Sequence, residues 1–341
     1  MLAEPPFSIL DNFSKVDDAI DVNAEIADAI LAAGLASFGL PVNPTPDDPV
    51  RNWHGTANAS DVNKAHSTIR QLYRDWSCEG AREQEVCYGP VLRALHNEFG
   101  DRTAQEEIKV LVPGAGLGRL VFQVCKNGFA AEGNEISYHQ LMASSWVLNH
   151  TAGPKRHALY PFALHFSNLH SREQQLQKVL VPDVHPATAL METDPNAVGS
   201  MGMSAADFTV AYRSESNRGA FHAVTTVFFI DTAPNLIRYI EAIHNCLKPD
   251  GIWVNVGPLL WHFEDGKSHN EQQPEGIGEP GNVELTEEEV LCLVERMGFT
   301  VETRPSQDGP ECGYIQDPRS MLQNNYRPSV WTARKSNSKY I

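Results

Sequence analysis

Residues 110–120 have the sequence Val110-Leu-Val-Pro-Gly114-Ala-Gly116-Leu-Gly118-Arg-Leu120, an apolar run followed by three glycines at alternate positions. This order predicts a strand, a tight turn and then a helix. Glycine suits such a turn because it accepts a positive φ and because the missing Cβ lets a ligand approach the backbone. Dinucleotide, flavin and S-adenosylmethionine (SAM) sites all use a turn of this kind, so the stretch alone leaves the ligand open.

An acidic residue follows at the spacing that a nucleotide site requires. Glu135 ends the run Phe129-Ala-Ala-Glu-Gly-Asn-Glu135, about twenty positions after Gly114. A second parallel strand would there bring a carboxylate to ribose hydroxyls. The alternative is that the glycines only form a close turn between strand and helix.

Composition limits the class of protein. The chain has 341 residues, of which 42% are hydrophobic, enough for one large α/β core with additions. A net charge of −16 argues against nucleic acid as a partner and favours a small or cationic substrate. The sequence has no apolar run of about 20 residues, and its first residues do not show a basic region followed by an apolar one. We therefore expect no membrane partner and a cytoplasmic or nuclear location. The six cysteines are scattered and are expected to be reduced.

We expect three parts along the chain. Residues 1–50 form a partly flexible N-terminal extension with a helix over Val22–Ala33 and a proline-rich connection after it. Residues 51–105 form a helical segment that covers the ligand site. Residues 106–341 form the α/β domain, with an insertion at about 163–203.

The helical segment has an apolar face at helical spacing. One helix is expected to begin at Ala59 and to bury the face that includes Leu72 and Trp76, and a second is expected to begin near Pro90. Gln71 and Arg74 project polar groups beside this face. Simple solvation is the alternative for Arg74.

After the glycine turn, helical and strand patterns alternate, which predicts a doubly wound, mostly parallel sheet. The expected order is helix 117–127, the strand ending at Glu135, helix 138–148 and a third strand at 157–162. The insertion that follows is rich in histidine, but no close His/Cys pair supports a metal, so we expect no metal site. Residues 203–208 are expected to form a loop beside the ligand.

The run Ala220–Ile230 is typical of a strand buried on both faces, and Asp231 directly follows it. Open α/β sheets place ligand contacts at such strand ends. The alternative is that Asp231 caps the helix beginning near Pro234. That helix ends at the turn Lys248-Pro-Asp-Gly251, and a strand at 252–256 follows.

The remaining chain predicts a surface loop, a capped helix and a strand pair. Residues 264–283 are expected to be the loop, and Thr286 and Glu289 form a capping box for a helix that ends at Gly298. Residues 299–304 and 329–335 are expected to form a terminal antiparallel hairpin.

Taken in order, these features resemble a class I SAM-dependent methyltransferase, a Rossmann-like α/β fold. More narrowly, the chain from about 50 to 335 resembles the carnosine N-methyltransferase family. The resemblance rests on Gln71-Leu-Tyr-Arg74-Asp-Trp-Ser77, Val112-Pro-Gly-Ala-Gly-Leu-Gly-Arg119, Gly133-Asn-Glu135, Phe228-Phe-Ile-Asp231-Thr-Ala and Gly257-Pro-Leu-Leu-Trp-His262. It implies methyl transfer from SAM to an imidazole nitrogen of a histidine-containing dipeptide, carnosine to anserine.

Site residues follow from the resemblance, position by position. The implied SAM contacts are Gln71, Arg74, Gly114, Glu135, Asp207 and Phe208, to which the glycine turn itself adds Gly116 and Gly118. The implied dipeptide contacts are Asp231, His262, Tyr314 and Tyr326, of which Asp231 and His262 are the expected catalytic residues. The tyrosine-bearing tail and the 163–203 insertion depart from the pattern.

The expected chemistry also has a basis in the residues. A carboxylate that accepts a hydrogen bond from one imidazole N–H fixes the tautomer and leaves the other nitrogen free to attack. A histidine such as His262 orients the ring or relays a proton. The alternatives are another acceptor, such as protein histidine, or a non-catalytic SAM-binding protein. A homodimer is the assembly we consider.

Overall fold

The computed structural model describes residues 2–48, 51–100, 107–193, 198–261, 283–306 and 308–336. The chain divides into two compact units, each assembled from separate stretches. Unit 1 comprises Met1–Glu83, His139–Ala189 and Gly313–Asn325, and unit 2 comprises Gln84–Tyr138, Leu190–Cys312 and Tyr326–Ile341. The three sequence ranges expected above stay a prediction.

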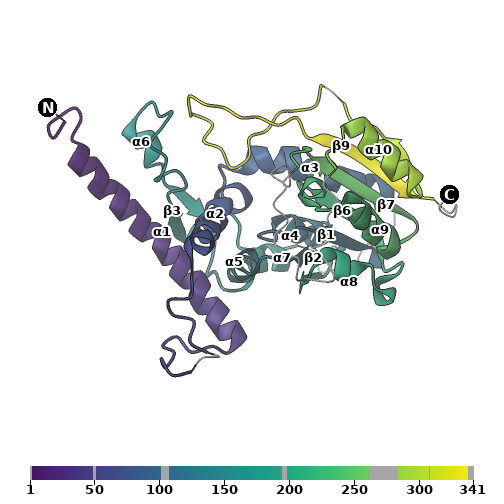
Figure 1. The fold of residues 1–341 in the computed structure, drawn as a ribbon, viewed down its shortest axis with the longest axis horizontal. Coiled ribbons are helices and arrows are strands. Elements are labelled where there is room, and N and C mark those ends of the chain that lie inside the picture. The colour runs from purple at the N-terminus through teal and green to yellow at the C-terminus, as the bar shows by residue number, and fades with distance from the viewer. Residues whose placement is uncertain are drawn as a thin grey trace. The chain divides into compact units, whose positions relative to one another are not determined.

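Unit 2 contains a seven-stranded sheet in the order β5-β2-β1-β6-β7-β9-β8. Figure 1 labels β2, β1, β6, β7 and β9 of this sheet. All neighbours from β5 to β7 are parallel, and β9 runs antiparallel to both β7 and β8. The doubly wound, mostly parallel sheet and its terminal hairpin are therefore confirmed. The strands are β1 Lys109–Pro113, β2 Ala130–Glu135, β5 Met201–Ala205, β6 Phe221–Val227, β7 Leu247–Gly257, β8 Phe299–Thr303 and β9 Ser329–Lys335.

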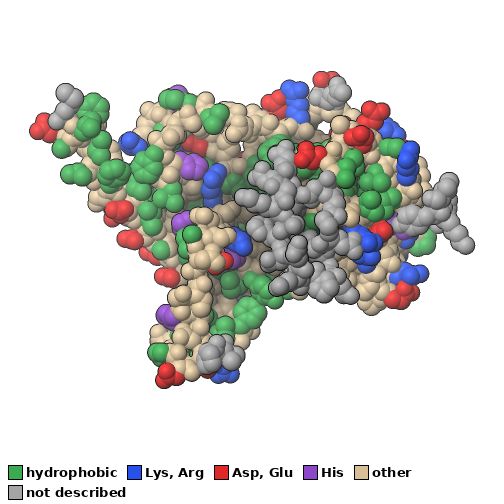
Figure 2. Space-filling model, viewed as in Figure 1, with side chains coloured by type: hydrophobic (Ala, Val, Ile, Leu, Met, Phe, Trp, Pro, Cys, Tyr) green, Lys and Arg blue, Asp and Glu red, His purple; other side chains and the backbone are tan. Residues whose placement is uncertain are grey.

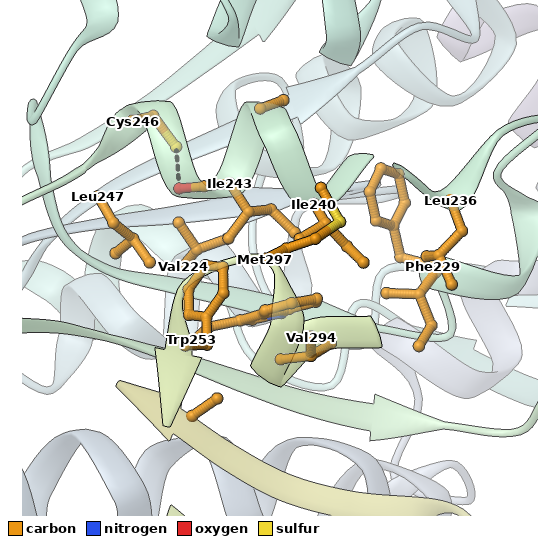
Figure 3. Packing of buried hydrophobic residues seen from close by; sticks show 14 of the residues in the cluster. Val224, Phe229, Leu236, Ile240, Ile243, Cys246, Leu247, Trp253, Val294 and Met297 are labelled. Carbon is orange, nitrogen blue, oxygen red and sulfur yellow. Dashed lines mark hydrogen bonds between the residues drawn. The ribbon is translucent and has the colours of Figure 1, made fainter. Parts of the chain in front are cut away.

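Helices cover both faces of this sheet. Alternate residues of a strand point to opposite sides, and apolar side chains on both sides of the sheet are buried under helices. On β1, Val110 and Val112 belong to a core with α3 and α4, whereas Leu111 belongs to a second core with α9 and α10. Figure 3 shows the second core, where Trp253 lies among α9 residues such as Ile240 and Ile243. The helices are α3 Ala81–Phe99, whose first three residues belong to unit 1, α4 Arg119–Lys126, α8 Phe208–Tyr212, α9 Leu236–Cys246 and α10 Glu287–Arg296, with short 3-10 turns at Glu215–Asn217 and Ile230–Thr232.

Unit 1 is mainly helical and contains a separate two-stranded antiparallel sheet of β3 and β4. Helix α1 lies beside β3, and Asn23 of α1 exchanges two hydrogen bonds with the backbone of Tyr160. The elements of this unit are α1 Ile9–Phe38, α2 Ala59–Trp76, α5 Tyr138–Asn149, β3 His157–Leu159, α6 Arg172–Gln175, β4 Val179–Val181 and α7 Pro186–Met191, with the ends of α5 and α7 belonging to unit 2.

The prediction that residues 157–162 form the third strand of the large sheet is wrong. Residues 157–159 do not join the large sheet but pair with Val179–Val181 inside the expected insertion. The place beside β2 is taken by β5, part of which was expected to be a loop. A short strand can form its backbone hydrogen bonds equally well in either sheet. The residues of the strand therefore do not predict which sheet it joins.

Several boundaries also differ. Helix α1 is longer than Val22–Ala33, because its buried face already begins at Val16. Helix α3 starts at Ala81 and contains Pro90, which was expected at its beginning. Strand β6 stops at Val227, where Phe228 turns the chain with φ 51°. The expected turn at 248–251 lies within β7. There the register of the β6–β7 pairing shifts, between the pairs Phe221–Leu247 and Ala223–Ile252.

The helix starts expected from capping residues agree with the structure more closely. Helix α10 has the expected capping box between Thr286 and Glu289. Helix α2 begins at Ala59 and has a capping box of its own, formed by Asn58 and Asp61. The expected loop at 264–283 lies almost entirely outside the described residues.

Two further observations concern the surface. Figure 2 shows hydrophobic and acidic side chains along α1, where Leu10, Phe13 and Phe38 are exposed. None of the helices in the described ranges is long and apolar enough to cross a membrane.

Candidate active site

The glycine turn between β1 and α4 has a left-handed backbone. Gly114, Gly116 and Gly118 have φ values of 64°, 55° and 76°, which L side chains rarely adopt. A Cβ on Gly114 would lie 2.6 Å from Cδ2 of Phe229. Two physical reasons therefore require glycine at position 114, its φ and the neighbouring ring.

Glu135 lies at the carboxyl end of β2, with only 7% of its surface exposed. Its Oε1 accepts the backbone N–H groups of Ile136 and Ser137, both at 2.8 Å. Its Oε2 accepts the N–H of Gly116 at 3.0 Å. The carboxylate thus connects the second strand to the glycine turn, and an Oε2 lone pair remains available to a hydroxyl donor.

Asp207 and Phe208 follow β5 in unit 2. Asp207 caps the short helix α8, because its Oδ1 accepts the N–H groups of Thr209 at 2.8 Å and Val210 at 3.0 Å. Phe208 is buried against Phe229, with ring centroids 5.4 Å apart. The implied SAM contact of Phe208 thus lies next to the ring that faces Gly114.

Asp231 follows β6 within a 3-10 turn and is 3% exposed. Its Oδ2 accepts the backbone N–H of Leu260 at 3.1 Å. The helix that Asp231 was alternatively expected to cap, α9, is capped by Asn235, whose side chain accepts from Ile237. The capping interpretation of Asp231 is therefore wrong.

Tyr326 belongs to the same unit as Asp231. Its backbone bridges to Cys312, and its ring packs edge-to-face against Phe228 with centroids 5.8 Å apart. Phe228 lies three positions before Asp231. Unit 2 thus places one of the two implied substrate tyrosines against the turn that carries the aspartate.

The other implied tyrosine lies in unit 1 with Gln71 and Arg74. Arg74 forms a two-pronged ion pair with Asp75 at 2.7 and 3.0 Å, and its guanidinium carbon lies 4.9 Å from the ring centroid of Tyr314. The side chain of Arg74 is only 14% exposed, so simple surface solvation does not describe it. Gln71 is buried on the same helix. Whether either residue contacts SAM stays a prediction.

The residue after Tyr314 is held on both sides of its backbone. Ile315 has φ 51°, an unusual value for a β-branched residue. Its N–H donates to Glu83 at 2.9 Å, and its carbonyl accepts from Arg70 at 2.7 Å. Sequence reasoning missed Glu83 and Arg70, because no local pattern relates them to position 315.

One implied site residue, His262, lies outside the described residues, so its role stays a prediction. Among the ranges that the structure describes, no group of three or more His, Cys, Asp or Glu residues is arranged to hold a metal ion. The described cysteines are free thiols.

Comparison with known proteins identifies the family. A family model described as Carnosine N-methyltransferase matches residues 51–337. The chain belongs to the carnosine N-methyltransferase family. The Carnosine N-methyltransferase of Schizosaccharomyces pombe is 36% identical over 99% of this chain and 87% of its own length. The mouse protein of that name is also 36% identical, over 95% of this chain and 75% of its own length.

Membership in the carnosine N-methyltransferase family settles what the glycine turn left open. The methyl donor of the chain is SAM, rather than a nicotinamide or flavin cofactor. The strand order, with five parallel strands followed by an antiparallel pair, is that of a class I methyltransferase. Another relative, Carnosine N-methyltransferase unmet of Drosophila melanogaster, is 38% identical over 80% of this chain and 55% of its own length.

Proposed function

We propose that this protein transfers the methyl group of SAM to an imidazole ring nitrogen of a histidine-containing dipeptide, converting carnosine to anserine. Family membership supports the reaction class and the acceptor. The observation that carries the mechanism is the buried carboxylate of Asp231, which lies at the carboxyl edge of the sheet and is not used to cap a helix.

The cofactor fits the residues of unit 2. Three glycines with positive φ leave the turn after β1 without side chains, and Glu135 presents a carboxylate at the end of the next strand. That carboxylate would accept hydrogen bonds from the ribose hydroxyls, as in other nucleotide sites of this architecture. SAM, when bound, supplies an electrophilic methyl group on a sulfonium.

The protein's own task is to present one imidazole nitrogen with its lone pair free. A neutral imidazole has one N–H and one lone pair. Asp231 would accept the N–H, so that the opposite nitrogen attacks, and its negative charge would stabilise the imidazolium that forms. Leu260 donates its N–H to Asp231 and thereby orients the carboxylate. We propose that His262 orients the ring or relays the proton.

Transfer of a labelled methyl group tests the proposal. The protein is incubated with methyl-labelled SAM and carnosine, and the methylated nitrogen is identified by NMR of the isolated product. Label on carnosine supports the proposal. Label only on added proteins would assign a protein histidine or another acceptor, and SAM binding without transfer to either would indicate a non-catalytic protein.

The partner and location proposals are separate. We propose a small-molecule dipeptide as the partner, a cytoplasmic or nuclear location, and a homodimer as the assembly. Light scattering of the purified chain tests the assembly, and imaging of the tagged chain in cells tests the location.

A further inference from the structure

Unit 1 contains a cavity of about 380 Å³ that the proposed mechanism does not use. Residues from α1, α2, the end of β3 with the segment after it, and the Tyr314–Ile315 pair form its wall. This volume falls in the range of small-molecule sites, which begins at roughly 300 Å³.

The polar part of the wall combines one cation with groups that can donate hydrogen bonds to a ligand. Arg70 supplies a guanidinium, His66 and His165 supply imidazoles, and Asn63 and Ser67 supply an amide and a hydroxyl. None of the described residues that line the cavity is Asp or Glu. In a chain of net charge −16, such a wall is a local exception to the prevailing charge. Its electrostatic preference is for an anion.

Two contacts within the protein fix the position of Arg70, but they do not use all of its N–H donors. One terminal nitrogen donates to the carbonyl of Ile315 at 2.7 Å, and the other lies 3.3 Å from Nε2 of His165. These bonds occupy two of the five guanidinium N–H groups. One N–H on each terminal nitrogen therefore remains to donate to a ligand carboxylate.

The neighbouring charges leave the guanidinium available to a ligand. Glu83 interacts electrostatically with Arg70, but it does not line the cavity, and its carboxylate accepts the N–H groups of Ile315 and Gln316. Burial and the charge of Arg70 lower the pKa of His165, which favours a neutral ring that accepts from Arg70. Arg70 therefore supplies the permanent positive charge of the cavity wall.

The rest of the wall is apolar or aromatic. Tyr160 and Tyr314 contribute rings, and Ile69, Pro161 and Leu164 contribute aliphatic surface. One positive charge matches a singly charged carboxylate better than a phosphate, which carries nearly two negative charges at neutral pH. Apolar walls match a ligand whose body is a ring or a short carbon chain.

We propose that this cavity binds a small organic molecule through its carboxylate, with Arg70 as the anchoring cation. The carboxylate could come from the dipeptide substrate, which rests on the proposed function, or from a separate small molecule. Both sources share the same chemistry at Arg70.

Ligand-observed fluorine NMR with para-fluorobenzoate as the probe tests the proposal on the full chain. We expect the probe signal to broaden with the wild-type protein, and its affinity to fall about tenfold in Arg70→Gln, because a charge-assisted contact is lost. The matched control is Arg82→Gln, since Arg82 is an exposed arginine of the same unit. Para-fluorobenzyl alcohol, which lacks the carboxylate, is the control ligand.

A second variant separates ligand binding from the support that Arg70 gives to Ile315. Leu164→Trp fills the cavity from a wall residue that is 53% exposed and leaves Arg70 unchanged, so it should also abolish probe binding. Wild-type binding of the probe by either Arg70→Gln or Leu164→Trp would overturn the proposal. So would no binding to the wild type, or equal affinity for the benzyl alcohol.

Competition then identifies the source of the carboxylate. Displacement of the probe by carnosine but not by β-alanylhistamine, its analogue without a carboxylate, assigns the cavity to the substrate. Probe binding that carnosine does not disturb assigns it to another carboxylate and also supports the proposal. The NMR result does not depend on methyl transfer, so failure of the proposed function would be seen separately in the labelling experiment.

Discussion

The carboxylate of Asp231 accepts the backbone N–H of Leu260, the residue that follows β7 by three positions, at 3.1 Å. This bond connects the segments after two adjacent parallel strands, β6 and β7, at the edge where such sheets bind ligands. Asn235 is the N-cap of α9, so the buried charge of Asp231 is not the cap of that helix. A buried carboxylate is costly unless it serves a structural or chemical purpose, so the charge itself can be tested.

Asp231→Asn should lower methyl transfer to carnosine by about a hundredfold or more, because the amide keeps size but loses the charge that fixes the tautomer and stabilises the imidazolium. The amide oxygen can still accept the N–H of Leu260. SAM affinity and the unfolding temperature should therefore stay near wild type. Methyl transfer at the wild-type rate by a folded Asp231→Asn protein would remove Asp231 from the mechanism.

Gly116→Val should abolish SAM binding. A β-branched residue is strained at φ 55°, so the turn would shift and its N–H would leave Glu135. Gly202→Val is the matched control, because Gly202 lies in β5 with no heavy atom within 4 Å of an added Cβ. Isothermal titration with SAM should show binding to the control and none to Gly116→Val. Wild-type affinity in a folded Gly116→Val protein would exclude the glycine turn as the SAM site.

Arg74→Ala should lower both stability and SAM affinity. Asp75 is 2% exposed and would lose its ion pair with Arg74, and breaking a buried pair in this way costs roughly 3–5 kcal/mol. We also expect SAM affinity to fall by about tenfold, the effect of one charge-assisted contact. Arg74→Lys keeps a charge for Asp75 but not the planar fork, so it should restore part of the stability and less of the affinity.

Chemical denaturation and calorimetric titration measure the two effects of Arg74 separately. Arg82→Ala is the control, because its side chain is exposed at the start of α3. An Arg74→Ala protein that loses stability but binds SAM like the wild type would assign Arg74 a purely structural role.

Acid should destabilise the fold in part through His244. Burial, with a smaller contribution from the charge of Lys335, lowers the pKa of His244 from 6.5 to about 4. Between these values the unfolded chain binds a proton that the folded state excludes, so stability is complete above pH 6.5 and falls as the pH decreases toward 4. The difference between the unfolding temperatures at about pH 7 and about pH 5 should therefore be smaller in His244→Gln. The exposed His150→Gln should retain the wild-type difference, and an unchanged difference in His244→Gln would contradict the assignment.

Local signals determined much of this protein. The glycine turn follows from φ preferences that few other residues share, and the α10 capping box follows from two residues three positions apart. The buried run at 220–227 and the terminal hairpin follow from β-branched and apolar patterning. These features depend on neighbours in the chain, so the sequence alone was sufficient to predict the sheet apart from its edge strand β5, the turn and the approximate position of Asp231.

Tertiary structure decided what depends on residues far apart in the chain. It assigned the place beside β2 to residues 201–205 rather than 157–162, and it paired Asp231 with Leu260 instead of with a helix N-terminus. It also placed Glu83 and Arg70 on either side of Ile315, more than two hundred positions away. Each of these groups could satisfy its hydrogen bonds in several local ways, and only the packed chain selects which distant partner comes within reach.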